Sequence, residues 1–371
     1  WLLVLIKGVF AFFSSAGKKY SDSDADFTKN IEKLSQELEK HPDTVELLVK
    51  RAEALFNIQH WDEALSDYNR AIELEPEAGD LYYARASVFE TLNRTEAAIN
   101  DYDAAIKHGS DLTSVLNDKA LLYQMTGNNL KAAEMYTDLI QASDKWWLPY
   151  YNRGICFFNE QENEKALADF SKAVVLNPKE KDIYWHLAFV NERLGQNKEA
   201  ENNYTQTLSF DKTNAAVLYH RAQLYEKQNI FNKAEKDYTA IETIHKEVAP
   251  SDYYPAALKS RAKIYNSQQN YKQAVADYSL LISIAPAPEN YLFRGMAYSK
   301  LRDLDAALND FNQVLEDDPN NVTALSMRGG IYAEKNDSQA AVADFEKALQ
   351  KGMNKHPQIM DYINKHRKEE P

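Results

Sequence analysis

The single cysteine of the chain, Cys156, lies in the stretch RGICFFNEQENEKALADF, between Arg153 and a run of carboxylates. A thiol beside a cationic side chain is the arrangement that lowers a thiol pKa and yields a nucleophile. A cysteine also serves as a small apolar residue in the interior of helical proteins. The residues at equivalent places elsewhere in the chain decide between these interpretations.

Two histidines, His186 and His220, are separated by 34 residues and could approach each other in a repeated structure. No carboxylate recurs with them at a spacing typical of metal ligands, so we predict no metal site. A Gly-rich phosphate loop, a His-x-x-x-His pair and a nucleophile elbow are also missing from the sequence. We therefore predict that the chain is not an enzyme and needs no cofactor.

The elements that position these residues are copies of one segment, seen in EALSDYNRAIELEP, KALADFSKAVVLNP and QAVADYSLLISIAP. Each copy contains an anchor alanine, and nine anchors recur at spacings of 34 residues five times, then 40, 33 and 34. The anchors are Ala64, Ala98, Ala132, Ala166, Ala200, Ala234, Ala274, Ala307 and Ala341. A period of this length indicates a stack of repeated units.

Two further positions recur with each anchor. An aromatic residue follows four positions later, at Tyr68, Tyr102, Tyr136, Phe170, Tyr204, Tyr238, Tyr278, Phe311 and Phe345. A small residue precedes by twelve, at Ala52, Ala86, Ala120, Gly154, Ala188, Ala222, Ala262, Gly295 and Gly329. A small side chain lets two helices approach closely, and the aromatic ring fills the space beside it. The pattern predicts two antiparallel helices per unit.

This arrangement resembles the tetratricopeptide repeat (TPR) family, whose units have the same length and the same small, aromatic and alanine positions. The resemblance implies an all-α fold, a right-handed superhelical solenoid of antiparallel helix pairs. We expect nine units over residues 43–353, with a longer sixth unit near 245–255. Residues 26–42 are expected to form an N-terminal capping helix, and 354–371 a C-terminal capping helix with a polar tail, because end units of a stack expose apolar faces.

The repeat places Cys156 ten residues before its anchor. The same position elsewhere holds Ala54, Val88, Leu122, Val190, Leu224, Ile264, Ala297 and Ile331. All of these are apolar, so we predict an inert thiol inside the helix packing.

Arginine occurs thirteen residues before seven of the anchors, and aspartate three residues after the same seven. The predicted ion pairs are Arg51 with Asp67, Arg85 with Asp101, Arg153 with Asp169, Arg221 with Asp237, Arg261 with Asp277, Arg294 with Asp310, and Arg328 with Asp344. The other two units have Lys119 with Met135 and Leu187 with Asn203, so arginine and aspartate are lost together. This favours a pair within each unit that joins its two helices.

The resemblance also implies that the first helix of each unit lines a concave groove. In the middle of the chain these lining positions are apolar, at Leu121, Met125, Leu148, Tyr151, Ile155, Phe158, Trp185, Phe189 and Tyr219. A clustered aromatic surface is typical of a site for a peptide or helix. We predict a partner protein or peptide segment with apolar or aromatic side chains; packing between repeats is the alternative for some of these residues.

Relatives that hold the carboxyl tails of heat-shock proteins use a lysine and an asparagine on the first helix. The corresponding positions here read Val49 with Glu53, Tyr151 with Ile155, and Lys259 with Lys263. We therefore predict no heat-shock-protein tail clamp.

The net charge argues against nucleic acid as a partner. The chain has 43 Lys and Arg against 56 Asp and Glu, a net charge of -13, which disfavours a nucleic-acid surface. One cysteine also excludes a disulfide framework.

The first residues, WLLVLIKGVFAFF, are apolar except for Lys7 and Gly8. Within residues 1–25 they fit a signal peptide, a truncated membrane anchor, or an apolar helix docked on the solenoid. Thirteen residues are too few to span a bilayer alone, which needs about 20. The first two interpretations predict a membrane-associated or exported protein, with a bacterial envelope or periplasm preferred; the third leaves it cytoplasmic.

Together these patterns predict a non-enzymatic scaffold or adaptor that holds a partner segment in the groove, directed to a membrane through residues 1–16 or exported. Two alternatives stay open. The chain could be an accessory subunit of a membrane-bound complex, or a chaperone-like holder of apolar client segments.

Overall fold

The computed structural model describes residues 24–367, which form twenty helices and no strand. The chain divides into two compact units, residues 1–179 (unit 1) and residues 180–371 (unit 2). The helices of unit 1 are α2 (Asp24–Lys40), α3 (Val45–Asn57), α4 (Trp61–Leu74), α5 (Gly79–Thr91), α6 (Thr95–Lys107), α7 (Leu112–Met125), α8 (Asn129–Ala142), α9 (Trp147–Asn159) and α10 (Asn163–Leu176). Those of unit 2 are α11 (Lys181–Arg193), α12 (Asn197–Phe210), α13 (Ala215–Lys227), α14 (Phe231–Glu247), α15 (Tyr254–Ser267), α16 (Tyr271–Ile284), α17 (Pro288–Lys300), α18 (Leu304–Asp317), α19 (Val322–Glu334), α20 (Ser338–Gln350) and α21 (Pro357–His366).

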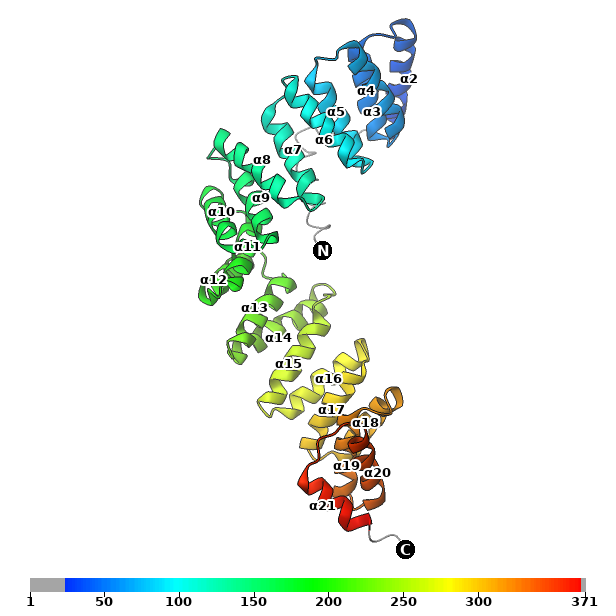
Figure 1. Cartoon of the computed structure of the whole chain (residues 1–371), viewed down its shortest axis with the longest axis vertical. Coiled ribbons are helices and arrows are strands. Elements are labelled where there is room, and N and C mark those ends of the chain that lie inside the picture. The colour runs from blue at the N-terminus through cyan, green and yellow to red at the C-terminus, as the bar shows by residue number, and fades with distance from the viewer. Residues whose placement is uncertain (1–23, 368–371) are drawn as a thin grey trace. The chain divides into compact units, whose positions relative to one another are not determined.

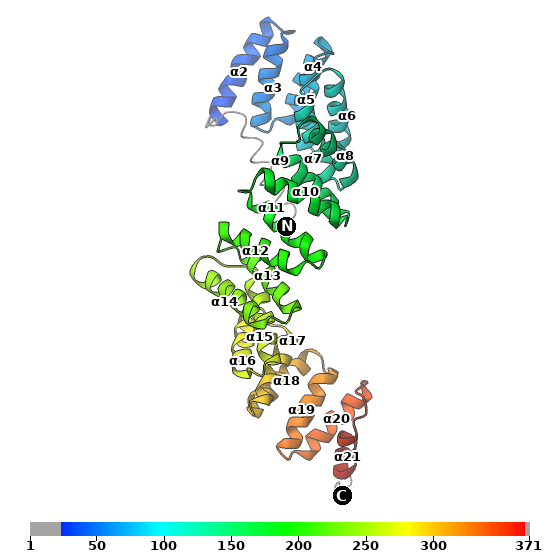
Figure 2. The ribbon, with the colours of Figure 1, turned by 90° about the vertical axis from the view of Figure 1, so that its left-hand side faces the viewer.

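Within each unit the helices follow one another as antiparallel pairs (Figures 1 and 2). The first helix of every pair ends a short turn before the second begins, and pairs such as α3 with α4 or α19 with α20 pack most extensively. The predicted all-α fold, a solenoid of helix pairs, is confirmed. α2 precedes the first pair and α21 follows the last.

The recurring spacing of small and aromatic residues produces the contact inside each helix pair. All nine anchor alanines are fully buried, and the nine aromatic residues are almost fully buried. Glycine occupies the small position only where the aromatic residue is phenylalanine, at Gly154, Gly295 and Gly329, and alanine is present wherever it is tyrosine. A Cβ atom on each glycine would lie 2.8 to 3.0 Å from the ring of its phenylalanine. In these three repeats the small position therefore cannot hold a methyl group unless the ring moves.

The turn between the two helices of each pair has the same backbone conformation in all nine repeats. The residue five positions before the anchor has a positive φ, at Gln59, Asn93, Gly127, Gln161, Gly195, Asn229, Gln269, Arg302 and Asn336. The amide of the next residue then donates back into the first helix, as His60 does to the carbonyl of Leu55 at 2.9 Å. This closes the first helix and reverses the chain.

The insertion in the sixth repeat lengthens α14 to 17 residues and adds an ordered loop before α15. His245 stacks on Tyr254 with ring centroids 4.2 Å apart, and the amide of Ser251 donates to His245 Nδ1 at 3.0 Å. The loop is thus fixed to the end of α14, and Tyr253 is its last residue, immediately before α15.

The predicted targeting segment, residues 1–16, lies outside the described residues. Between residues 24 and 367, no helix is both long and apolar enough to cross a lipid bilayer.

Candidate functional site

The structure brings together all seven predicted arginine–aspartate pairs. In each pair the arginine Nε and Nη2 donate to the two carboxylate oxygens at 2.7 to 2.9 Å. Two parallel hydrogen bonds of this kind fix both side chains in one geometry. The seven aspartates are buried. Each pair therefore joins the two helices of its repeat, and its role is structural.

The third guanidinium nitrogen has a partner that the sequence analysis did not identify. Nη1 of each arginine donates at 2.6 to 3.1 Å to a side chain on the helix before the repeat, at Ser35, Asn69, Thr137, Thr205, Thr239, Ser279 and Asn312. Every arginine thus connects three helices. The signal was available, since five of these residues lie 16 positions before the arginine.

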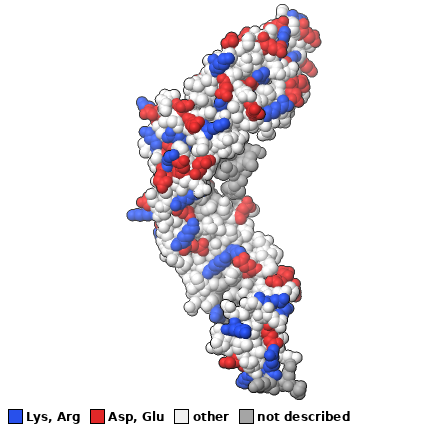
Figure 3. Space-filling view, in the orientation of Figure 1, with Lys and Arg blue, Asp and Glu red and all other residues white. Residues whose placement is uncertain are grey.

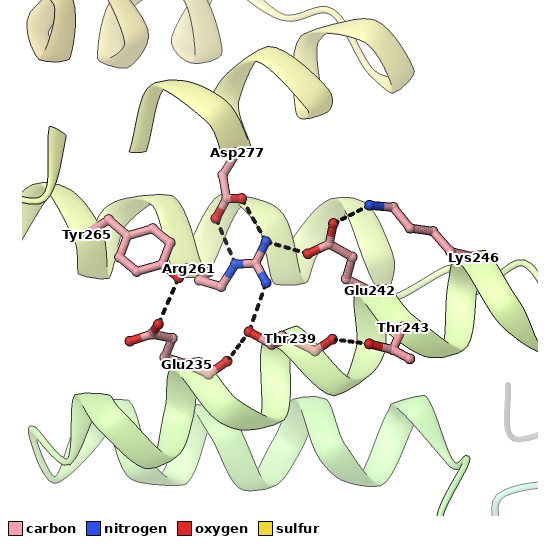
Figure 4. A network of polar contacts seen from close by, with 8 residues as sticks. All are labelled: Glu235, Thr239, Glu242, Thr243, Lys246, Arg261, Tyr265 and Asp277. Carbon is pink, nitrogen blue, oxygen red and sulfur yellow. Dashed lines mark hydrogen bonds and ion pairs between the residues drawn. The ribbon is translucent and has the colours of Figure 1, made fainter. Parts of the chain in front are cut away.

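Arg261 is the most enclosed of these connectors, and Figure 4 shows its polar contacts. It donates to Asp277 at 2.7 and 2.8 Å, to Glu242 at 2.7 Å and to Thr239 at 2.9 Å. Its side chain is 7% exposed, and Glu242 is shared with Lys246. Glu242 belongs to α14, and Lys246, its second partner, lies in the last turn of this lengthened helix, so the insertion of the sixth repeat is tied into the network.

Lys119 replaces the arginine in the third repeat, and its ion pair is made to the preceding helix and not to the second helix of its own repeat. It forms an ion pair with Asp103 on the preceding helix, at the position that elsewhere holds Ser, Thr or Asn. The aspartate of its own repeat is replaced by Met135. A cationic side chain therefore still connects this repeat to the preceding one, while the ion pair inside the repeat is lost.

Cys156 is fully buried, and burial raises the pKa of its thiol to about 12. The neighbouring Arg153 is engaged with Asp169 and Thr137. The thiol therefore stays protonated near neutral pH. No nucleophile is formed here.

The predicted groove residues of unit 1 differ in exposure. Met125 is 46% exposed, while Leu121, Ile155 and Phe158 are half-buried. Leu148 and Tyr151 are only 8% and 7% exposed, and Tyr151 packs on Trp147 and Phe170. The last two residues therefore contribute to packing between helices and offer little surface to a partner.

In unit 2 the three predicted groove residues lie in a larger aromatic cluster, defined here as Trp185, Phe189, Tyr219, His220 and Tyr253. Trp185 and Phe189 meet edge to face at 4.5 Å, and both pack on the ring of His220, at 5.4 and 4.9 Å. Tyr219 lies 5.4 Å from Tyr253. All five rings are half-buried, so each keeps part of its surface in contact with solvent.

Two members of this aromatic cluster were not predicted. His220 comes from α13, where partial burial lowers the pKa of its imidazole, so the ring is neutral and apolar in character near neutral pH. Tyr253 comes from the inserted loop and packs on Tyr219 and His220 of α13, the first helix of the same repeat. The loop near 245–255 thus extends an aromatic surface.

The second histidine, His186, is a half-buried residue of α11, and its Nδ1 lies 2.8 Å from the carbonyl oxygen of Asp182 one turn earlier. Burial lowers the pKa of His186 as well. Over residues 24–367, no group of three or more His, Cys, Asp or Glu side chains is placed to hold a metal ion.

Surface charge shows the mixed pattern that the composition predicts. On the face drawn in Figure 3, acidic and basic side chains are interspersed with large uncharged areas. A continuous basic surface of the kind that follows a nucleic-acid backbone is not seen on that face.

The helix pairs and their repeated side chains define a helical-repeat protein, and comparison with known families specifies which. Sequence models of the tetratricopeptide repeat match residues 49–111 and 294–356, residues 148–180, and residues 260–288, together about half of the chain. The chain belongs to the tetratricopeptide repeat family. Proteins of this family bind protein or peptide partners and are typically non-enzymatic scaffolds.

Solved structures of the same fold include a tetratricopeptide repeat protein from Parabacteroides merdae, 22% identical, covering 68% of this chain and 98% of that one with a TM-score of 0.44. YrrB, described as having an unusual peptide-binding site, is 15% identical, covers 52% and 98%, and has a TM-score of 0.45. The TPR domain of P58(IPK) is 17% identical, covers 99% and 96%, and has a TM-score of 0.30. No curated protein matches the sequence.

Proposed function

We propose that the protein is a non-enzymatic scaffold that binds an apolar or aromatic segment of a partner protein at the aromatic cluster of unit 2. The observation that carries the proposal is the contact of five half-buried rings from two helices and the inserted loop. Partly exposed aromatic rings that are held rigidly by one another cost little conformational entropy on binding, which is why such residues dominate protein interfaces.

The most regular polar groups of the repeats are used in structure. The seven arginines and their aspartates join helices, and the thiol is protonated and enclosed. The surface that remains for function is therefore a binding surface. The partner's segment would present aliphatic or aromatic side chains to the faces of the rings, because those faces are apolar.

The same proposal places the protein at a membrane or outside the cytoplasm, and it rests on the apolar residues at positions 1–13. Expression of residues 1–371 and of residues 17–371 in the native host, followed by membrane fractionation, tests this part. Membrane association or export of the longer chain alone supports it. Equal distribution of the two chains in the cytoplasm contradicts it.

Affinity capture from the host's membranes tests the partner site. The bait is the full chain, and the test variant carries Trp185→Ser and Phe189→Ser. Because these two rings also touch the buried Tyr204, circular dichroism must show that the variant is folded. A second variant, Tyr253→Ser, removes a ring at the edge of the cluster. Val175→Ser is the matched control, since Val175 is an apolar residue of unit 1 that is 75% exposed.

We expect one partner protein to be captured by the full chain and the control, and to be lost from both cluster variants. Capture that is equal for all baits would contradict a site at the aromatic cluster. Competition by many unrelated apolar peptides would instead identify a chaperone-like holder. Retention in a detergent-extracted assembly only when residues 1–16 are present would identify an accessory subunit of a membrane complex.

A further inference from the structure

A cluster of polar side chains in unit 1 has a different character from the aromatic cluster. Glu90 of α5 and Asp118 of α7 are half-buried carboxylates that lie on neighbouring first helices. Tyr83 donates to Asp118 Oδ2 at 2.6 Å, and Asn117 Nδ2 donates to Asp118 Oδ1 at 3.1 Å. The tyrosine bond connects α5 to α7, the helices that carry the two carboxylates.

Two buried polar atoms beside these carboxylates have no hydrogen-bond partner among the described residues. One is Asn117 Oδ1, on a side chain that is 4% exposed, and the other is the hydroxyl of the fully buried Tyr102. The Asn117 amide is oriented by its bond to Asp118, so the free atom is the acceptor oxygen. A buried acceptor without a donor is costly, and a donor from outside the chain, a water molecule or a ligand, relieves that cost.

The carboxylates also have no cation. No Lys, Arg or His of residues 24–367 forms an ion pair with Glu90 or Asp118. Burial raises the pKa of Glu90 to about 7, and the nearby Asp118 adds to the rise. Burial also raises the pKa of Asp118, while its hydrogen bonds with Tyr83 and Asn117 oppose the rise. The Tyr102 hydroxyl is near enough to lower the pKa of Glu90 but makes no hydrogen bond of normal geometry with it.

The surface next to this carboxylate pair is hollowed. A cavity of about 270 Å³ is lined by Glu53, Phe56, Asn57, Tyr68, Ala84, Ser87 and Val88. Tyr83, Ser87 and Glu90 follow one another along one face of α5, so the cavity and the carboxylate pair adjoin. Lys50, on the neighbouring α3, is already paired with Glu46 at 2.6 Å.

We infer that Glu90, Asp118 and the Asn117 carbonyl oxygen form a subsite for the cationic head of a lysine or arginine side chain in the partner segment, with the adjoining cavity receiving a neighbouring side chain. The inference rests on the proposed function, a scaffold that binds a partner segment, and adds a charge requirement to it. An ammonium group donates three hydrogen bonds and accepts none, and the lone pairs that Glu90, Asp118 and Asn117 Oδ1 leave unused within the chain can accept them. The rings of Tyr83 and Tyr102 also favour a cation nearby.

Binding of short labelled peptides to the full chain tests this subsite. One peptide of Gly, Ala and Leu carries a central lysine, and its twins carry norleucine or glutamate at the same place. Fluorescence anisotropy is measured at low salt and at a pH above the raised pKa of Glu90. We expect the lysine peptide to bind about tenfold more tightly than the norleucine twin, with the glutamate twin weakest.

The double variant Glu90→Gln with Asp118→Asn should bind the lysine and norleucine peptides equally. Its matched control is Glu134→Gln with Asp138→Asn, which removes two exposed carboxylates from α8 and should keep the preference. Equal binding of both peptides by the unaltered chain would overturn the inference whether or not the variant folds. A preference that persists in the double variant would also overturn it, because the cation would then bind elsewhere.

Failure of this subsite and failure of the proposed aromatic site give different results. If the Trp185→Ser and Phe189→Ser variant still prefers lysine while capturing the same partner as the unaltered chain, the acidic subsite stands and the aromatic site falls. If lysine and norleucine bind alike while partner capture depends on Trp185 and Phe189, only the acidic subsite falls.

Discussion

Gly154 and Phe170 pack so closely that a Cβ atom on Gly154 would lie 2.8 Å from the phenylalanine ring. The two residues belong to the two helices of one repeat, and the same relationship holds for Gly295 with Phe311. Where the aromatic residue is tyrosine, its hydroxyl reaches toward the end of the first helix, as Tyr238 does to Glu226 at 2.8 Å. The choice between glycine and alanine therefore follows the identity of the ring across the helix interface.

Gly154→Ala should lower the free energy of unfolding by about 1 kcal/mol. Alanine favours a helix over glycine by about 1 kcal/mol, but the added methyl group forces a well-packed ring to move, at a cost of about 1 to 3 kcal/mol. Urea unfolding followed by circular dichroism measures the change.

Gly330→Ala is the matched control, because Gly330 is also inside a helix but nothing lies within 4 Å of an added Cβ. It should raise the free energy of unfolding by about 0.5 to 1 kcal/mol. Two substitutions of the same sign would show that helix propensity, and not the Phe170 contact, determines the effect at Gly154.

Arg261→Met should destabilise the chain by about 3 kcal/mol, because it leaves Asp277 and Glu242 enclosed with one cation fewer. Arg51→Met should cost only about 1 kcal/mol, since the Arg51 side chain is 25% exposed and water replaces part of the lost interaction. The unfolding free energies of both variants are compared in urea.

The double variant Arg261→Met with Asp277→Leu should recover part of the loss, since no isolated carboxylate is then left in the pair. A double variant as unstable as the sum of the two single variants would argue against an effect of the unpaired charge.

Much of this architecture could be predicted from the sequence, because the repeat period places each residue type at a fixed angle on its helix. The nine helix pairs and the seven pairings such as Arg153 with Asp169 follow from that period. Contacts between repeats were harder to predict from the sequence, since they depend on how far apart the helices of neighbouring repeats lie. The burial of Tyr151, the place of Tyr253 on a loop outside the period, and the closeness of Glu90 and Asp118 all depend on that distance.

Glu90→Gln should change how stability depends on pH. The pKa of Glu90 rises from an ordinary value of 4.5 to about 7, mainly by burial, with Asp118 adding to the rise and the Tyr102 hydroxyl opposing it. Because the folded chain holds the proton more tightly, this group contributes stability that is complete below pH 4.5 and is lost as pH rises through 7. The neutral glutamine should remove this loss, and at higher pH the variant should be more stable by about 2 kcal/mol.

Unfolding free energies across this pH range, for the unaltered chain and for Glu90→Gln, measure the difference. Glu134→Gln, which removes an exposed carboxylate from α8, controls for the change in net charge. Parallel pH profiles for the unaltered chain and Glu90→Gln would contradict the raised pKa.

Gln161→Gly should raise the free energy of unfolding by about 0.5 to 1 kcal/mol. Gln161 has φ of 63° in the turn between α9 and α10, a left-handed conformation that costs a residue with a side chain about 1 to 2 kcal/mol. Glycine adopts it without that cost but loses more freedom on folding, so only part of the strain energy is gained.

The reciprocal substitution is Gly195→Ala at the equivalent turn, where φ is 72° and nothing lies within 4 Å of an added Cβ, so its expected loss of about 1 kcal/mol comes from the backbone alone. Urea unfolding of both variants tests the pair, and a stabilised Gly195→Ala would show that the left-handed turn is not retained in solution.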